Sequence, residues 1–175
     1  TLAALRQHIF NWTIWPDFNV IPDNNAPFLQ YSELSLGVTS DMNGRKITAL
    51  PVNHVVPAVG YHIEGGEYSL VYTGDTTVCD ELWVALTKIH NLKYLIIETA
   101  FSNSEYALAK LSKHLCPSML ASELGKLGAD TLADEFTVFI THLKPGEDAV
   151  IMNEIAHIAS SLTINQLRKD HIFNL

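Results

Sequence analysis

Four ionisable residues stand at or just beyond the ends of apolar segments that have the composition of buried strands. They are His54 after ITALPV, Asp75 after LVYTG, Glu98 after YLII and His142 after FTVFIT. In layered α/β folds the loops at one edge of the sheet collect functional groups on a rigid base, so His54, Asp75 and His142 are predicted to converge there. Imidazole and carboxylate groups together suit zinc, iron or manganese. The pattern therefore raises the hypothesis of a metal site.

Asp75 has two interpretations from the local sequence. Its carboxylate has two oxygens and could bridge two metal ions about 3.5 to 4 Å apart. Aspartate at the end of a strand also often caps the following helix, because its side chain accepts hydrogen bonds from the first backbone N–H groups. Three ligands cannot hold two ions, so the spacing of these residues alone leaves both interpretations open.

The rest of the sequence predicts one layered α/β unit that positions these residues. Helical spacing over Thr1 to about Phe10 leads into an aromatic loop that contains three prolines. Alternation of apolar and polar residues begins at Phe28, Asn43-Gly44 predicts a short hairpin, and a second hairpin joins residues 60–64 to 69–73. The later predicted elements are a helix with Leu82, Leu86 and Ile89 on one face, a buried strand over 93–101, helices over 104–115 and 116–128, a last buried strand over 136–143 and a helix over 146–162.

Composition and charge limit the partners. The chain has 175 residues, of which 47% are hydrophobic and 17% charged, as expected for one globular domain. The formal net charge of −8 leaves no broad basic surface for a nucleic-acid polymer, so an anionic substrate must meet a local cation such as a metal ion. No apolar run approaches the roughly 18 to 20 residues that span a bilayer, and the N-terminus has no secretory pattern. We expect a soluble, cytoplasmic protein with a small-molecule substrate and no membrane partner, and a homodimer is one expected assembly.

Three stretches together resemble the metallo-β-lactamase-fold hydrolases, and more closely their class II 3′,5′-cyclic-nucleotide phosphodiesterases. They are VNHVVPAVGYHIEGGEYSLVYTGDTT, LIIETAFSN and VFITHLKP, and the resemblance extends over nearly the whole chain. Its specific part is the order of a histidine, Gly-Tyr, Gly-Asp-Thr, a buried strand with a glutamate, and Thr-His. The resemblance implies an α/β fold, the four-layer αββα sandwich, of which residues 1–175 would be the C-terminal, larger part, incomplete at the N-terminus.

The resemblance also implies a binuclear site and a reaction. His54, Asp75 and His142 would be metal ligands, with Asp75 bridging two divalent ions, zinc in the first place and manganese or iron as alternatives. A water held between the ions, with its pKa lowered toward neutrality, would attack the phosphorus of a cyclic nucleotide or a related small phosphodiester. Asp75 and Glu98 are the predicted catalytic residues.

Residues near this site receive further predicted roles. Lys144 and Asn103 are predicted to bind substrate, Lys144 because it is the best cation near His142 for a phosphate. Glu98 is predicted to orient His142 or a water through a hydrogen bond, with a cap for the following helix as the alternative. Ile97-Glu98-Thr99-Ala100 stands where the related tRNA 3′-processing enzymes carry His-Glu-Ala-Thr, and the loss of the histidine argues against tRNA processing.

The family pattern includes a His-x-His-x-Asp-His motif in its N-terminal half, and these 175 residues do not contain it. We expect the chain to be the C-terminal portion of a longer protein and to bind metal weakly by itself; a degenerate form without complete metal sites is the other explanation. Two other functions stay open. One is another hydrolase of this fold acting on a thioester, a lactam or an RNA phosphodiester, and the other is a non-catalytic remnant of the fold.

Three other histidines, one lysine and three aromatic residues are predicted to have structural roles, with a nucleobase-stacking pocket as the alternative for the aromatic residues. These residues are His62 as a surface or core histidine with its hydrogen bonds satisfied, Lys113 and His114 as charges at a helix end, His8 as a packing residue, and Trp12, Trp15 and Phe18 as cover for the core.

Overall fold

The computed structural model describes residues 1–127, 132–158 and 161–175, which divide into two units, Thr1–Ser35 and Leu36–Leu175. The smaller unit contains helix α1 (Leu2–His8) and the aromatic loop that follows it, in which Trp12 and Trp15 keep more than half of their surface exposed. Residues 28–35, all of them described, form no strand. The strand alternation predicted from Phe28 is therefore wrong there, because these residues do not take part in the pairing of the described strands.

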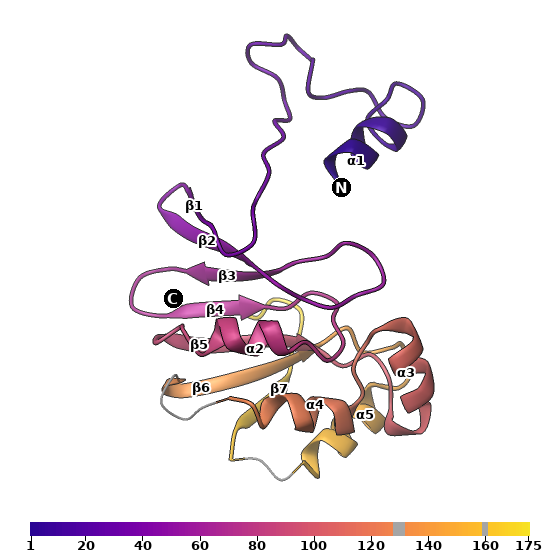
Figure 1. The fold of residues 1–175 in the computed structure, drawn as a ribbon, viewed down its shortest axis with the longest axis vertical. Coiled ribbons are helices and arrows are strands. Elements are labelled where there is room, and N and C mark those ends of the chain that lie inside the picture. Colours follow the sequence, from indigo (N-terminus) through magenta and orange to yellow (C-terminus); the bar gives the residue numbers. More distant parts are fainter. Residues whose placement is uncertain (128–131, 159–160) are drawn as a thin grey trace. The chain divides into compact units, whose positions relative to one another are not determined.

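Leu36–Leu175 is built on a seven-stranded sheet whose strands lie side by side in chain order (Figure 1). The first three pairings, β1 to β4, are antiparallel, and the last three, β4 to β7, are parallel. The strands are β1 (Thr39–Met42), β2 (Arg45–Leu50), β3 (Gly60–Glu64), β4 (Ser69–Tyr72), β5 (Leu92–Glu98), β6 (Leu132–Thr141) and β7 (Thr163–Gln166). β7 was not predicted, because only Ile164 among its four residues is apolar.

The hairpin between β1 and β2 follows from its turn residues. Asn43 and Gly44 have φ angles of 57° and 83°, the left-handed pair that a two-residue hairpin turn requires and that Asn-Gly adopts readily. The Gly44 backbone N–H also donates to Asp41 Oδ1 at 3.0 Å. This predicted hairpin is confirmed, as is the second one between β3 and β4.

The helices of this unit pack on one face of the sheet and form the main core with it. They are α2 (Asp80–Leu86), the short 3-10 helix η1 (Asn103–Glu105), α3 (Tyr106–Ser112), α4 (Pro117–Leu124) and α5 (Asp148–Ala156). Leu82, Leu120 and Ile151 from α2, α4 and α5 pack with alternate strand residues such as Leu95 and Ile140. All four predicted helices of this region are present, although Gly128, Ala159 and Ser160 of their predicted ranges lie outside the described residues.

The opposite face of the sheet carries a smaller apolar cluster. Leu70, Ile96 and Phe139 are buried there, and the C-terminal segment packs on them through Phe173 and Leu175. The two faces thus have different cover, helices on one and extended chain on the other. No helix in the described part of the chain is both long and apolar enough to cross a membrane.

Strand direction explains why the candidate residues meet. β2 and β4 run the same way because each pairs antiparallel with β3, and β5 and β6 run parallel to β4. The carboxyl ends of these four strands therefore lie at one edge of the sheet. His54, Asp75 and His142 follow three of these ends, and Glu98 is the last residue of β5.

A buried hydrogen-bond cluster ties α2 to α4 and gives a stability prediction. Trp83 Nε1 and the Cys79 backbone N–H both donate to the carboxylate of Glu123, which is 2% exposed and also pairs with Lys126. Trp83→Phe removes one donor from this buried charge, so the free energy of unfolding measured in urea is expected to fall by roughly 1 to 3 kcal/mol. Val84→Ala, on the exposed side of α2, is the control and should change it by less than about 0.5 kcal/mol. Equal losses in both variants would contradict this role of Trp83.

Candidate metal centre

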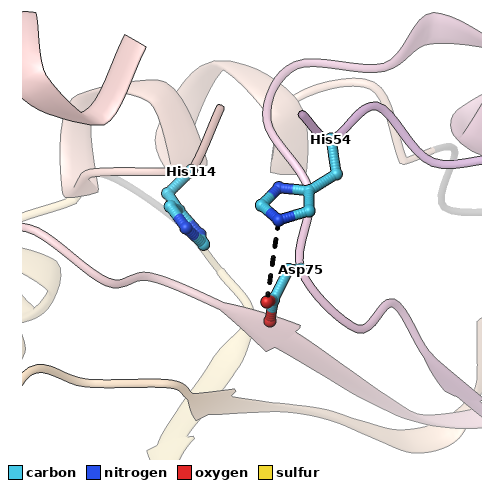
Figure 2. A group of neighbouring side chains, drawn as sticks. All are labelled: His54, Asp75 and His114. Atoms are coloured by element: carbon cyan, nitrogen blue, oxygen red, sulfur yellow. Dashed lines mark ion pairs between the residues drawn. The ribbon is translucent and has the colours of Figure 1, made fainter. Parts of the chain in front are cut away.

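Asp75 faces two histidines at the edge of the sheet. His54 Nε2 lies 3.9 Å from Asp75 Oδ2 (Figure 2), and His142 Nδ1 lies 3.9 Å from Asp75 Oδ1. His54 belongs to the loop after β2, Asp75 to the loop after β4, and His142 directly follows β6. The structure therefore brings together the three residues that the sequence predicts as metal ligands.

The spacing of these donors suits metal ions better than direct hydrogen bonds. A separation of 3.9 Å is longer than an N–H···O hydrogen bond, whereas zinc binds imidazole nitrogen and carboxylate oxygen at about 2.0 to 2.2 Å. Because the two oxygens of Asp75 face different histidines, each pair could hold its own ion. The donor set fits zinc, manganese or iron.

The backbone around these residues takes conformations that side chains usually avoid. His142 has a φ angle of 60°, in the left-handed region that is uncommon for residues other than glycine. Gly74, directly before Asp75, also has a φ angle of 60° and leaves no side chain in the turn. Non-glycine residues held in such conformations cluster at functional sites. The strained backbone of His142 therefore supports a functional site at this edge of the sheet.

His114 is a fourth member of the cluster that the sequence analysis did not place there. One possible ligand atom from each of His54, Asp75 and His114 lies within 4.8 Å of the others (Figure 2). The His114 ring stacks on the ring of His142 with centroids 5.1 Å apart and meets that of His54 edge-on at 4.9 Å. The predicted role of His114 as a charge at the end of a helix is therefore wrong.

Glu98 is held inside the protein behind His114. It is completely buried, and it accepts hydrogen bonds from the backbone N–H groups of Thr76 at 2.9 Å and Leu115 at 3.2 Å. Its Oε1 also lies 2.6 Å from His114 Nδ1. The Glu98 side chain thus contacts His114 and not His142, so the predicted contact with His142 is wrong. Glu98 also lies too many residues before η1, which begins at Asn103, to cap that helix.

Burial controls the protonation of this pair. Loss of hydration raises the pKa of Glu98 to about 7, despite the two backbone N–H groups and His142, which favour the charged form. Burial also lowers the pKa of the His114 imidazole, although the Asp75 charge opposes this. Both directions favour a neutral pair. With Glu98 protonated, its O–H donates to His114 Nδ1, and the ring proton of His114 must then sit on Nε2.

The helix-cap interpretation of Asp75 is wrong. The next helix, α2, begins at Asp80, and its capping position is Cys79. No hydrogen bond joins the Asp75 carboxylate to a backbone N–H group of the described residues around it, whereas two histidines face it. The carboxylate therefore has its described partners across the loops and not along its own chain.

Lys144 and Asn103, the two predicted substrate-binding residues, differ in the contacts that their side chains make. Lys144 Nζ lies 3.7 Å from the centre of the Phe101 ring and close enough to lower the pKa of His114. The Asn103 side-chain oxygen instead accepts the Ser118 backbone N–H at 2.8 Å, at the start of α4. Lys144 thus adds positive charge beside the site, while Asn103 supports a helix; contact of either residue with substrate stays a prediction.

His62 lies in a different part of the unit. It is 9% exposed, burial lowers its pKa, and its Nε2 has no hydrogen-bond partner among the described residues. It lines a cavity of about 510 Å³ together with Thr48, Glu64 and Lys88, and none of the residues around that cavity belongs to the metal centre. The prediction that the hydrogen bonds of His62 are satisfied is wrong for Nε2.

The fold and the site together define a protein of the metallo-β-lactamase fold: a sheet with helices on one face and a histidine–carboxylate cluster beyond the carboxyl ends of its strands. Solved structures agree. The chain is similar to unliganded yeast PDE1 with a TM-score of 0.76 at 19% identity, over 95% of this chain and 56% of that one. It is similar to the metallo-β-lactamase fold protein YhfI from Bacillus subtilis with a TM-score of 0.61 at 20% identity, over 77% and 52% of the two chains. The predicted fold class is thereby confirmed.

A curated protein is also similar in sequence. It is the "Probable 3',5'-cyclic-nucleotide phosphodiesterase" of Yersinia pestis, 29% identical over 185 residues, which cover 89% of this chain and 52% of the relative. The chain thus spans about half the length of the curated relative it matches. No family model matches it.

Proposed function

We propose that the protein is a metal-dependent phosphodiesterase that hydrolyses a cyclic nucleotide or a related small phosphodiester with two divalent ions, zinc in the first place. The observation that carries this proposal is the geometry of Asp75, whose two oxygens each face a different histidine at 3.9 Å. A carboxylate placed in this way is what a two-ion site needs as its bridge. The name of the Yersinia pestis relative supports the choice of substrate class.

Different residues of the chain would have different roles in this reaction. Bound ions would supply a nucleophilic water of lowered pKa and positive charge for the phosphate oxygens. Asp75, His54 and His142 would hold those ions. Lys144 adds a further cation beside the cluster, which would attract the anionic phosphodiester in a protein of net charge −8.

His114 is the group best placed to assist the leaving oxygen. Its Nδ1 is bound to buried Glu98, so its Nε2 is the nitrogen left for other partners, beside His54 and Asp75. With Glu98 protonated, Nε2 carries the ring proton and can donate it to the departing ribose oxygen while Nδ1 takes the proton of Glu98, so that the ring stays neutral and Glu98 becomes a carboxylate. Glu98 thus sets the proton position on His114 and receives this role in place of the predicted contact with His142.

The test compares two phosphodiesters that differ in their leaving groups. In the gene product that contains these residues, His114→Ala is expected to reduce hydrolysis of cyclic AMP by about 100-fold or more, because an alkoxide leaves poorly without a proton. Hydrolysis of bis(p-nitrophenyl) phosphate should fall much less, since p-nitrophenolate leaves readily by itself. His90→Ala, an exposed histidine outside the cluster, is the control.

Other outcomes identify the alternatives. Hydrolysis of a thioester or a lactam but of neither phosphodiester would assign another reaction of this fold, and no hydrolysis in the presence of zinc, manganese or iron would assign a non-catalytic role. Equal losses on both phosphodiesters would remove His114 as the proton donor and leave it as a further candidate ligand.

A further inference from the structure

Asn53 ties together two of the loops that carry the candidate metal centre. Its backbone N–H donates to Thr76 Oγ1 at 3.1 Å, and its carbonyl oxygen accepts the Thr77 N–H at 2.8 Å. Its side-chain Nδ2 donates to the Val78 carbonyl at 3.0 Å. These three hydrogen bonds hold the loop after β2 against the loop after β4, so they fix the separation of the loops that bear His54 and Asp75.

Lys113 ties the same loop to the connection between α3 and α4. Its Nζ donates to Asn53 Oδ1 at 2.9 Å and to the His54 carbonyl at 3.3 Å. Its own backbone carbonyl lies 3.2 Å from His54 Nδ1. Because a carbonyl oxygen can only accept a hydrogen bond, His54 Nδ1 must carry the proton. In the neutral ring, the unprotonated nitrogen is then Nε2, the atom that faces Asp75.

The conformation of Lys113 is unfavourable for a lysine. Its φ and ψ angles of 56° and 50° are left-handed, at a helix end where glycine is the preferred residue. A lysine in this conformation therefore lowers the stability of the fold relative to glycine. Unlike glycine, it has a side chain that makes two hydrogen bonds to the loop after β2. Departures from a local rule of this kind are expected at functional positions.

We propose that Asn53 and Lys113 form a positioning clamp, which holds the His54 ring with Nδ1 protonated and Nε2 available to a divalent cation beside Asp75. The clamp rests on the proposed function only for the statement that the partner of Nε2 is a divalent metal ion. Ligand histidines of metal sites usually donate their second ring N–H to a carbonyl or carboxylate, and loss of such outer partners typically lowers metal affinity 10- to 100-fold. The clamp supplies that partner from Lys113 and keeps it in place through Asn53.

Lys113→Met tests the clamp, since it keeps the aliphatic stem and removes the ammonium group. In metal-free protein, long-range ¹H–¹⁵N spectra of wild type should show His54 as the Nδ1–H tautomer alone. In the variant the other tautomer should appear, and zinc affinity measured by chelator competition should fall about 10-fold. Lys110→Met, in α3 one turn before Lys113, is the matched control and should change neither quantity.

Lys113→Gly separates positioning from stability. Glycine suits the left-handed backbone, so the melting temperature should stay the same or rise while zinc affinity falls as in Lys113→Met. A purely structural lysine would make both fall together, which would overturn the clamp, as would a wild-type His54 protonated on Nε2 or an unchanged tautomer in Lys113→Met. The spectra need no metal; a shifted tautomer in a protein that hydrolyses no phosphodiester would support the clamp and overturn the proposed function.

Discussion

Zinc binding is expected to fall by more than about 100-fold when Asp75 is replaced by alanine, a larger loss than that caused by removing the hydrogen-bond partner of a ligand histidine. The reason is geometric, since Asp75 is the residue that faces both His54 and His142, through different oxygens. In protein that carries two ions, Asp75→Ala should lower the occupancy of both, and hydrolysis should be lost. Metal content is measured by mass spectrometry of the purified variants.

The single-histidine variants are the controls for this bridging role. His54→Ala should weaken chiefly one ion and His142→Ala chiefly the other, so that each variant keeps about one metal. Asp75→Asn keeps the size of the side chain and removes its charge, which separates loss of a ligand from a change in packing. An Asp75→Ala protein that melts at a lower temperature but still carries its full complement of metal would show that Asp75 is structural.

Glu98 is expected to make the metal-free protein less stable as the pH rises. Burial raises its pKa from the ordinary 4.5 to about 7, so the folded protein binds this proton more tightly than the unfolded chain does. The stabilisation by the bound proton is complete below pH 4.5 and is lost as the pH rises through about 7. The difference of about 2.5 pKa units corresponds to about 3 kcal/mol in the free energy of unfolding.

Glu98→Gln isolates this contribution, because glutamine is neutral at every pH. Relative to wild type, the variant should gain about 3 kcal/mol between pH 4.5 and pH 8 in urea denaturation with a chelator present. The lowered pKa values of His62 and His114 act in the opposite direction, costing stability as the pH falls. They contribute in both proteins, and repeating the comparison in a His114→Ala background removes the group that contacts Glu98. A difference that does not change with pH would contradict the buried, neutral carboxyl group.

The parts of the fold that were predictable from the sequence have local causes. The Asn43-Gly44 turn specifies its hairpin through two left-handed residues, and the helical spacing of Leu82 and Leu86 gives α2 its buried face. The common location of His54, Asp75 and His142 was also predictable from the sequence. Each of these residues follows an apolar strand, and the carboxyl ends of strands that run in one direction lie at the same edge of the sheet. The exposed alternation after Phe28 misled the prediction, since alternation forms a strand only where a partner strand is available.

The position of His114 was not predictable in this way, because it depends on contacts far apart in the chain. Its ring reaches the site through Glu98 and through the turn at Lys113, and neither contact leaves a pattern in neighbouring residues. The helix before it, α3, has only seven residues and spans about 10 Å, so His114 stays near the edge of the sheet at which that helix begins. The sequence pattern did not show this, because it predicts a longer helix, over residues 104–115, that includes His114.

The candidate metal centre lies where the sheet changes from antiparallel to parallel pairing at β4. His54 belongs to the antiparallel half, whose hairpins join residues close in sequence, and such hairpins form within about 1 to 10 μs. His142 belongs to the parallel half, whose longer crossovers must close before their strands can pair, which is slower. The candidate ligand set is therefore complete only when both halves of the sheet have formed and paired. Metal uptake would report the completion of folding, and a bound ion would hold the two halves together against unfolding.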